Sequence, residues 1–117
     1  MMLEIDMEFR KGILFVRLIG KLTNNTVGVL NKEVTNVVKD YGIGNIVFNV
    51  SGLIEIDVAG MEALINNYKV ATTYQGKTIV CGLENSVDMK KRMKKNHLFD
   101  YLFETSDELS ALHYFSH

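Results

Sequence analysis

The 117-residue chain has no proline and one cysteine, Cys81, so it cannot form an intramolecular disulfide. No apolar run approaches the ~20 residues that a bilayer-spanning helix needs. The opening stretch MMLEIDMEFRKG carries acids and alternates in character, which does not fit a signal peptide. The formal net charge is −1, so the whole molecule has no built-in long-range attraction for nucleic acid or an anionic membrane. We therefore expect one cytoplasmic domain over residues 1–117, with neither nucleic acid nor membrane among its partners.

Signatures of catalysis are also missing. The sequence contains no GxSxG elbow, no GxGxxG and no Walker motif. Cys81 lies in a predicted buried strand, where burial raises the pKa of a thiol. His113 and His117 have a spacing that could bind a metal, but no nearby Cys or Glu completes a ligand set, so solvated side chains are the simpler interpretation. The sequence favours a binding module over an enzyme, with no metal and no cofactor.

Hydrophobic periodicity predicts alternating strands and helices. The predicted strands are 3–9, 13–20, 45–50 and 77–83, the predicted helices are 23–42, 58–76, 85–97 and 105–115, and a short last strand lies within 98–104. Strands that alternate with helices imply right-handed crossovers and a parallel sheet core. We therefore predict an α/β fold: a mixed, mostly parallel sheet with an N-terminal hairpin and about four helices, packed mainly on one face.

Local signals suggest where the helices begin and end. Residues 23–25 offer N-caps for the first helix, and Gly42 offers a C-terminal stop. Gly28 should weaken that helix. Thr105 and Glu108 have the spacing of a capping box at the start of the last helix.

A single cluster of charge occurs in the chain. Its five cations are Lys90, Lys91, Arg92, Lys94 and Lys95. Such a run could attract phosphates or an acidic partner. No aromatic residues interleave with it, and methionines at 89 and 93 supply an apolar stripe on the same helix. We therefore favour a solvated helix face.

The stretch IEIDVAGMEAL (54–64) places a carboxylate where a strand meets a helix. Asp57 is a favoured N-cap, a role that contributes about 0.5–2 kcal/mol over alanine. Gly60 is harder to explain, because a glycine in a helix costs about 1 kcal/mol against alanine. Close approach of a neighbouring strand, or of a docking partner, would account for Gly60.

The segments taken together resemble the STAS domain, the fold of bacterial anti-sigma factor antagonists. The resemblance runs essentially end to end and is strongest with the sporulation-type antagonists. It rests on RLIGKL (17–22), NIVFNVSGLIEIDVAGMEAL (45–64), YQGKTIVCGL (74–83) and LF (98–99). It implies the STAS fold, and as partner an anti-sigma factor that is also a serine kinase. Binding of that partner would release a sigma factor.

The sequence departs from the family at the regulatory position. The resemblance implies a phosphorylated serine or threonine immediately before Gly60, but Ala59 stands there, preceded by Val58. Thr23 likewise stands where close relatives often have an acid. One interpretation is an antagonist without the phosphorylation switch. The alternative is a phosphorylation-independent adaptor or a small-ligand-binding module in another signalling or transport assembly.

The expected interface surrounds the start of the second predicted helix. Its residues are Asp57, Val58, Ala59, Gly60 and Glu62, with Asn24 and Asn25 nearby. We expect the protein to be a monomer or a weak dimer.

Overall fold

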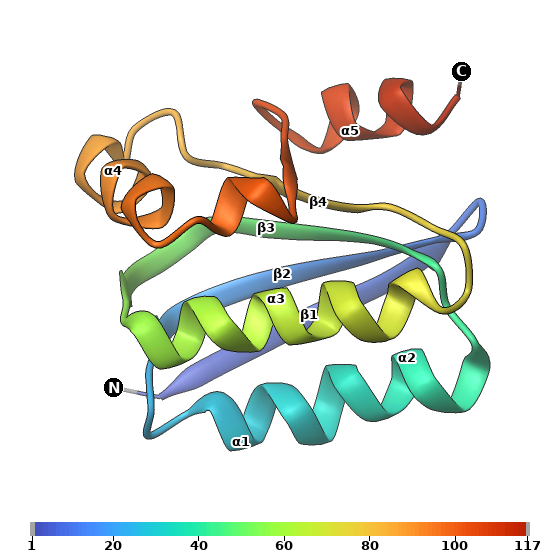
Figure 1. The fold of residues 1–117 in the computed structure, drawn as a ribbon, viewed down its shortest axis with the longest axis horizontal. Helices are drawn as coiled ribbons and strands as arrows, with labels where there is room; N and C mark the ends of the chain where they lie inside the picture. Colours follow the sequence, from blue (N-terminus) through green and yellow to red (C-terminus); the bar gives the residue numbers. More distant parts are fainter. Residues whose placement is uncertain (1, 117) are drawn as a thin grey trace.

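The computed structural model describes residues 2–116, so the interpretation of His117 concerns a residue outside the described ones. A five-stranded sheet runs through the molecule in the order β1-β2-β3-β4-β5 (Figure 1). The strands are β1 (Leu3–Arg10), β2 (Ile13–Leu22), β3 (Asn45–Ile56), β4 (Thr78–Cys81) and β5 (Phe103–Glu104). β1 and β2 are antiparallel and every other pair is parallel, which confirms the predicted hairpin and the mixed, mostly parallel sheet.

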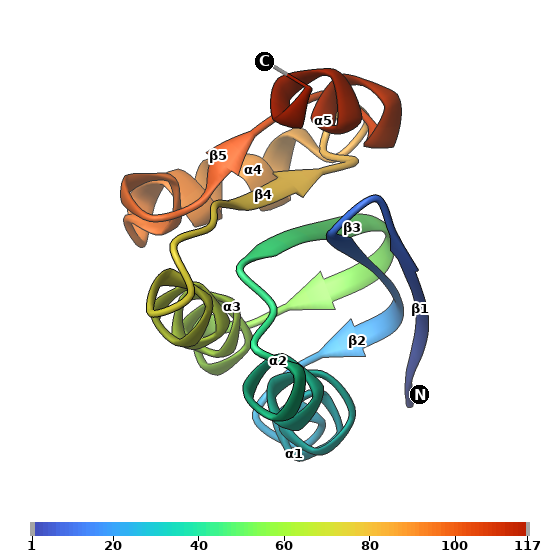
Figure 2. The same cartoon turned by 90° about the vertical axis from the view of Figure 1, so that its right-hand side faces the viewer.

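Helices cover the sheet unequally. The first helix is continuous through α1 (Val27–Leu30), the π-helical η1 (Asn31–Thr35) and α2 (Asn36–Tyr41). It lies beside α3 (Val58–Thr72) on one face, as Figure 2 shows. α4 (Val87–Lys95) and the 3₁₀ turn η2 (Leu98–Asp100) contribute to the same core, whereas α5 (Glu108–Phe115) packs on the opposite face. The prediction of about four helices, mainly on one face, is confirmed. None of the helices among residues 2–116 is long and apolar enough to cross a membrane.

The buried side chains form two clusters, one on each side of the sheet. The larger lies under the first helix, α3 and α4, and includes Leu18, Phe48, Leu64 and Met93. The smaller lies under α5 and contains Ile13, Phe15, Val47, Ile79, Cys81 and Ala111. β2, β3 and β4 contribute side chains to both clusters, so both of their faces are buried. This explains why their sequences are nearly continuous apolar runs.

Two strands are longer than predicted. β2 continues to Leu22 and β3 to Ile56, where the sequence suggested ends at 20 and 50. Leu53 and Ile56 are buried, and Leu22 pairs with Ile56, so the strands extend each other beyond the irregularities near Gly20. Ser51 and Gly52, which follow the predicted end of the strand, lie within β3. The longer strands bring the end of β3 directly against the loop that follows β2.

The helix ends correct two predictions. The first helix begins after Thr26 rather than after residues 23–25, and the Thr26 hydroxyl donates to the carbonyl oxygen of Lys21 at 2.8 Å instead of capping the helix. At α5 the predicted capping box is wrong: the Asp107 carboxylate accepts a hydrogen bond from the backbone N–H of Ser110 at 2.8 Å, and Glu108 is engaged elsewhere. The stop at Gly42 is confirmed, since Gly42 adopts a left-handed φ of 63°.

Candidate functional site

Asp57 ties two segments together at the corner between β3 and α3. One carboxylate oxygen accepts the backbone N–H of Gly60 at 2.8 Å, which caps α3 as predicted. The other oxygen accepts the backbone N–H of Asn24 at 2.9 Å, from the loop before α1. The backbone N–H of Asp57 itself donates to the carbonyl oxygen of Leu22 at 3.3 Å. Asp57 therefore fixes both the helix start and the position of the neighbouring loop.

Gly60 is explained by the fold. A Cβ atom added to Gly60 would overlap the carbonyl oxygen of Leu22 and approach the Ile56 Cγ1 atom at 2.9 Å. Of the two reasons considered for this glycine, close approach by a neighbouring strand is therefore confirmed: the first turn of α3 lies directly against the end of β2.

The structure gathers the seven predicted interface residues around this corner. Val58 is 49% exposed, and Ala59 is partly exposed. Asn24, Asn25 and Glu62 are exposed, whereas Gly60 is buried. Beside the corner lies a polar hollow of about 350 Å³, lined by Lys21, Thr23, Asn24, Asn25, Thr26, Glu55 and Asp57. Ala59 and Glu62 line a second, larger groove of about 710 Å³ that runs across α3 toward Asn96 and Tyr101.

Sequence reasoning missed the contribution of Arg92 to the corner. The Arg92 guanidinium donates to the backbone carbonyl of Ile56 at 2.6 Å, immediately before Asp57. A hydrogen bond from a charged donor contributes about 1.5–3 kcal/mol. One sequence feature does set Arg92 apart, because it is the one arginine in a run of lysines. The sequence gives no indication, however, of a backbone acceptor 36 residues away.

The rest of the basic run behaves as an ordinary amphipathic helix. Met89 and Met93 are buried in the main core, while Lys91, Lys94 and Lys95 are exposed. Lys90 pairs with Glu104 at 3.1 Å. These placements support a solvated helix face for the lysines.

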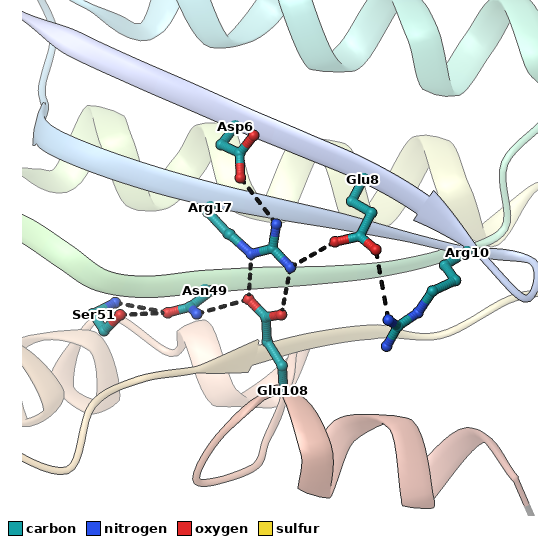
Figure 3. A network of polar contacts seen from close by, with 7 residues as sticks. All are labelled: Asp6, Glu8, Arg10, Arg17, Asn49, Ser51 and Glu108. Atoms are coloured by element: carbon teal, nitrogen blue, oxygen red, sulfur yellow. Dashed lines mark hydrogen bonds and ion pairs between the residues drawn. The ribbon is translucent and has the colours of Figure 1, made fainter.

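A polar network holds α5 on the opposite face of the sheet (Figure 3). Arg17 of β2 donates to both carboxylate oxygens of Glu108 at 2.8 Å and to Asp6 and Glu8 of β1 at 2.9 Å. Asn49 of β3 also donates to Glu108 at 2.8 Å. The Arg17 guanidinium holds the pKa of Glu108 below its usual range, and the Asn49 bond acts in the same direction. The network joins β1, β2, β3 and α5, so we interpret it as structural.

Two other candidates for chemistry are the buried thiol of Cys81 and a metal site. Burial raises the pKa of the Cys81 thiol to about 12, so the thiol stays protonated at neutral pH. Among residues 2–116 no three His, Cys, Asp or Glu side chains come together in a way that could hold a metal ion.

The mixed five-stranded sheet, the helices that cover it unequally and the capped corner at Asp57 define the class of protein, and the profile of the STAS domain family matches residues 4–111. The chain belongs to the STAS domain family. It is 26% identical over 112 residues to the anti-sigma F factor antagonist of Paenibacillus polymyxa, a match that covers 96% of this chain and 94% of that protein.

Two solved structures have the same fold. The unphosphorylated anti-sigma factor antagonist SpoIIAA superposes with a TM-score of 0.72 at 18% identity, covering 97% of each chain. An anti-sigma factor antagonist from Mycobacterium paratuberculosis superposes with a TM-score of 0.78 at 17% identity, covering 94% of this chain and 91% of that one. These likenesses confirm the predicted STAS fold. They do not test which residues form the interface, so those residues stay predictions.

Proposed function

We propose that this protein binds an anti-sigma factor through the corner at Asp57, releases a sigma factor, and does so without a phosphorylation switch. The observation that carries the proposal is the combination of a rigid, exposed corner with an alanine at its centre. Asp57 orders both the start of α3 and the loop at Asn24, and Val58 offers an exposed apolar contact between them. The similarity to the Paenibacillus polymyxa antagonist supports an anti-sigma factor as the partner.

A phosphate at this place would act as an effective switch. The position before Gly60 lies in the first turn of α3, and a helix N-terminus tolerates an anion. Phosphorylation adds about −1.5 to −2 charges, which would stand beside the Asp57 carboxylate and inside the surface that meets the partner. Ala59 has no hydroxyl to esterify, so this chain would remain in the state that binds.

The first test is phosphorylation. Incubated with ATP and the anti-sigma F factor of Paenibacillus polymyxa as the kinase, the wild-type chain is expected to gain no phosphate by intact mass spectrometry. Ala59→Ser is expected to gain one, because Ala59 is partly exposed at the helix start.

Ser51 and Thr73 are the alternative hydroxyl groups at which phosphate would be looked for in the wild-type chain. The Ser51 hydroxyl donates to Asn49 at 2.8 Å, and the Thr73 hydroxyl donates to the Val70 carbonyl at 2.7 Å. A phosphate on the wild-type chain would overturn the claim that the switch is absent. If Ala59→Ser gained no phosphate, the proposal that the kinase binds at this corner and reaches residue 59 would be contradicted.

The second test is binding, with the same anti-sigma F factor as the probe. Val58→Glu is expected to weaken binding about tenfold or more, because it places a charge in an apolar contact. Asp57→Lys is expected to weaken binding at least as much, but it also removes the cap of α3. Val58→Glu is therefore the cleaner variant, since Val58 is exposed and caps nothing. Isothermal titration calorimetry gives the affinities.

Leu109→Glu is the matched control, because Leu109 is 62% exposed on α5 and lies away from the corner. It should bind as the wild type does. Equal affinities for wild type and Val58→Glu would exclude the corner as the interface. No binding by the wild type would favour the alternative, a phosphorylation-independent adaptor or ligand-binding module.

A further inference from the structure

The free edge of β1 is the most conspicuous unused surface of the molecule. β1 is eight residues long and stands first in the strand order, and among residues 2–116 no strand pairs with its outer side. An unpaired edge of this length presents a row of backbone donors and acceptors to another chain. The opposite edge of the sheet, β5, has only two residues and offers far less.

The geometry of the hairpin determines which backbone groups face outward. β1 and β2 are joined by the two-residue loop Lys11–Gly12, whose φ angles of 55° and 79° match the tight turn that suits twisted hairpins. Such a loop is closed by a hydrogen-bonded pair, here Arg10 with Ile13, and hydrogen-bonded pairs alternate along antiparallel strands. The even-numbered residues of β1 therefore bond to β2, and the odd-numbered residues turn their N–H and C=O groups to the open edge.

Apolar side chains accompany this edge on the helix face of the sheet. Met7 is 36% exposed, Phe9 61% and Tyr41 of α2 78%. Phe9 and Tyr41 line a hollow of about 420 Å³ together with Leu14, Val37 and Ile43, and Met7 lies on the same face of the strand. The exposed fractions of Met7, Phe9 and Tyr41 show that these side chains are only partly covered within the described chain. Large apolar side chains gathered beside a free edge indicate an interaction surface.

We propose that β1 is a homodimerisation edge: two copies of the chain pair their β1 strands antiparallel about a twofold axis at Met7. The outward groups of Ile5 then bond to those of the second copy's Phe9, and the sheet continues across both copies. A twofold interface must be complementary to itself, and the pair of Glu4 with Arg10 meets that condition in this register.

Glu4 supplies the charge argument for a second copy. Arg17 already engages Asp6 and Glu8, but Glu4 forms no ion pair within residues 2–116. Pairing about Met7 places Glu4 opposite the second copy's Arg10, twice in the dimer. On its own chain Arg10 makes a long ion pair of 3.6 Å with Glu8, and its guanidinium lies 5.7 Å from the centroid of the Phe15 ring. Opposite charges that face each other across strands stabilise a pair, and like charges destabilise it.

Neighbouring registers fit less well. A shift of two residues one way places Asp6 opposite Asp6 of the second copy and Glu4 opposite Glu8. A shift the other way places Asp6 opposite Arg10 twice and Glu8 opposite Glu8 once, so charge alone does not exclude it, but it leaves Glu4 beyond the paired strands and shortens the overlap. In the register about Met7, Asp6 stands opposite Glu8 twice, but Arg17 donates to each of these carboxylates at 2.9 Å in both copies, which reduces the repulsion, and the overlap of the strands is longer.

A charge swap tests the dimer and its register together, measured by sedimentation equilibrium over a wide range of concentrations. The wild type is expected to dimerise. Glu4→Lys and Arg10→Glu are each expected to weaken dimerisation about tenfold, because each brings like charges together twice. The double variant Glu4→Lys/Arg10→Glu should recover most of the wild-type affinity. Leu109→Lys, on α5, should behave as the wild type does.

Crosslinking provides an independent readout. Met7→Cys is expected to form an intermolecular disulfide on mild oxidation, because opposed residues of paired strands lie about 5.5 Å apart at Cα, within the range of a disulfide. Phe103→Cys, on the short β5 edge, is the control and should crosslink much less. A wild type that is monomeric at every concentration, or single and double charge variants with equal affinities, would overturn the proposal. The corner residues lie outside this edge, so the dimer can fail while the proposed function holds.

Discussion

Replacing Gly60 with alanine is expected to lower the free energy of unfolding by about 1–3 kcal/mol, the range typical of overpacked sites. An added Cβ would overlap the Leu22 carbonyl oxygen, which belongs to the backbone of β2 and cannot rotate away. α3 must then shift at its first turn. The shift would disturb the Asp57 cap, whose bond to the Gly60 N–H is 2.8 Å long. Urea denaturation followed by circular dichroism measures the change.

Gly28→Ala is the matched control for Gly60→Ala. Gly28 also lies in the first turn of a helix, but a Cβ added there meets no atom within 4 Å. Only the helix propensity changes, so Gly28→Ala should raise stability by up to about 1 kcal/mol. Opposite signs for the same substitution would show that contact with β2, and not propensity, requires glycine at position 60. A stable Gly60→Ala variant would contradict the close packing described for this corner.

Glu108→Gln is expected to lower the free energy of unfolding at pH 7 by about 1–2 kcal/mol. The substitution removes the charge that accepts two bonds from Arg17 and one from Asn49. Hydrogen bonds to charged groups contribute about 1.5–3 kcal/mol, and partial exposure of Arg17 and Glu108 reduces that contribution. Loss of the ion pair should loosen α5, so amide hydrogen exchange in 108–115 should accelerate more than exchange in α3.

The effect of Glu108→Gln should depend on pH. Arg17 holds the pKa of Glu108 in the folded protein below its ordinary value of 4.5. A carboxylate whose pKa is lowered by folding stabilises the protein fully above that ordinary value, and the contribution is lost as the pH falls through the lower folded pKa. The difference between wild type and Glu108→Gln should therefore stay constant from pH 7 down to about 5.5 and shrink below about pH 4.5.

Glu33→Gln serves as the control for this pH dependence. Glu33 is exposed on η1 and forms no ion pair within residues 2–116, so its variant should follow the acid profile of the wild type. Parallel profiles for wild type and Glu108→Gln would show that the Arg17 pair does not contribute to stability.

Local patterns in the sequence were sufficient for most of the fold. The alternation at 3–9, the nearly continuous apolar run at 45–50 and the helical spacing after Asp57 all report the environment of each residue within one element. Asp57 as a cap and Gly42 as a stop depend on backbone groups only a few residues away, and both were predicted correctly. Short-range chemistry is visible in a sequence because both partners lie within the same few residues.

Long-range partners were the part that the sequence could not reveal. Arg92 reaches a backbone carbonyl 36 residues away, and Glu108 meets Arg17 across 91 residues. The local pattern at Thr105 and Glu108 fits a capping box, but the longer-range bond to Arg17 determines the position of Glu108. The ends of β2 and β3 were missed for a related reason, since each extends only because the other is beside it.

The two bonds of Asp57 also bear on the thermodynamics of association. A loop that must become ordered on binding loses conformational entropy, which reduces affinity. Here one carboxylate immobilises Asn24 and the start of α3 in the free protein, at 2.9 and 2.8 Å. A partner would therefore meet a preorganised surface, and its association should show a smaller entropic penalty than binding to a mobile loop. Asp57 would therefore lower the conformational entropy that the loop and the helix start lose when a partner binds.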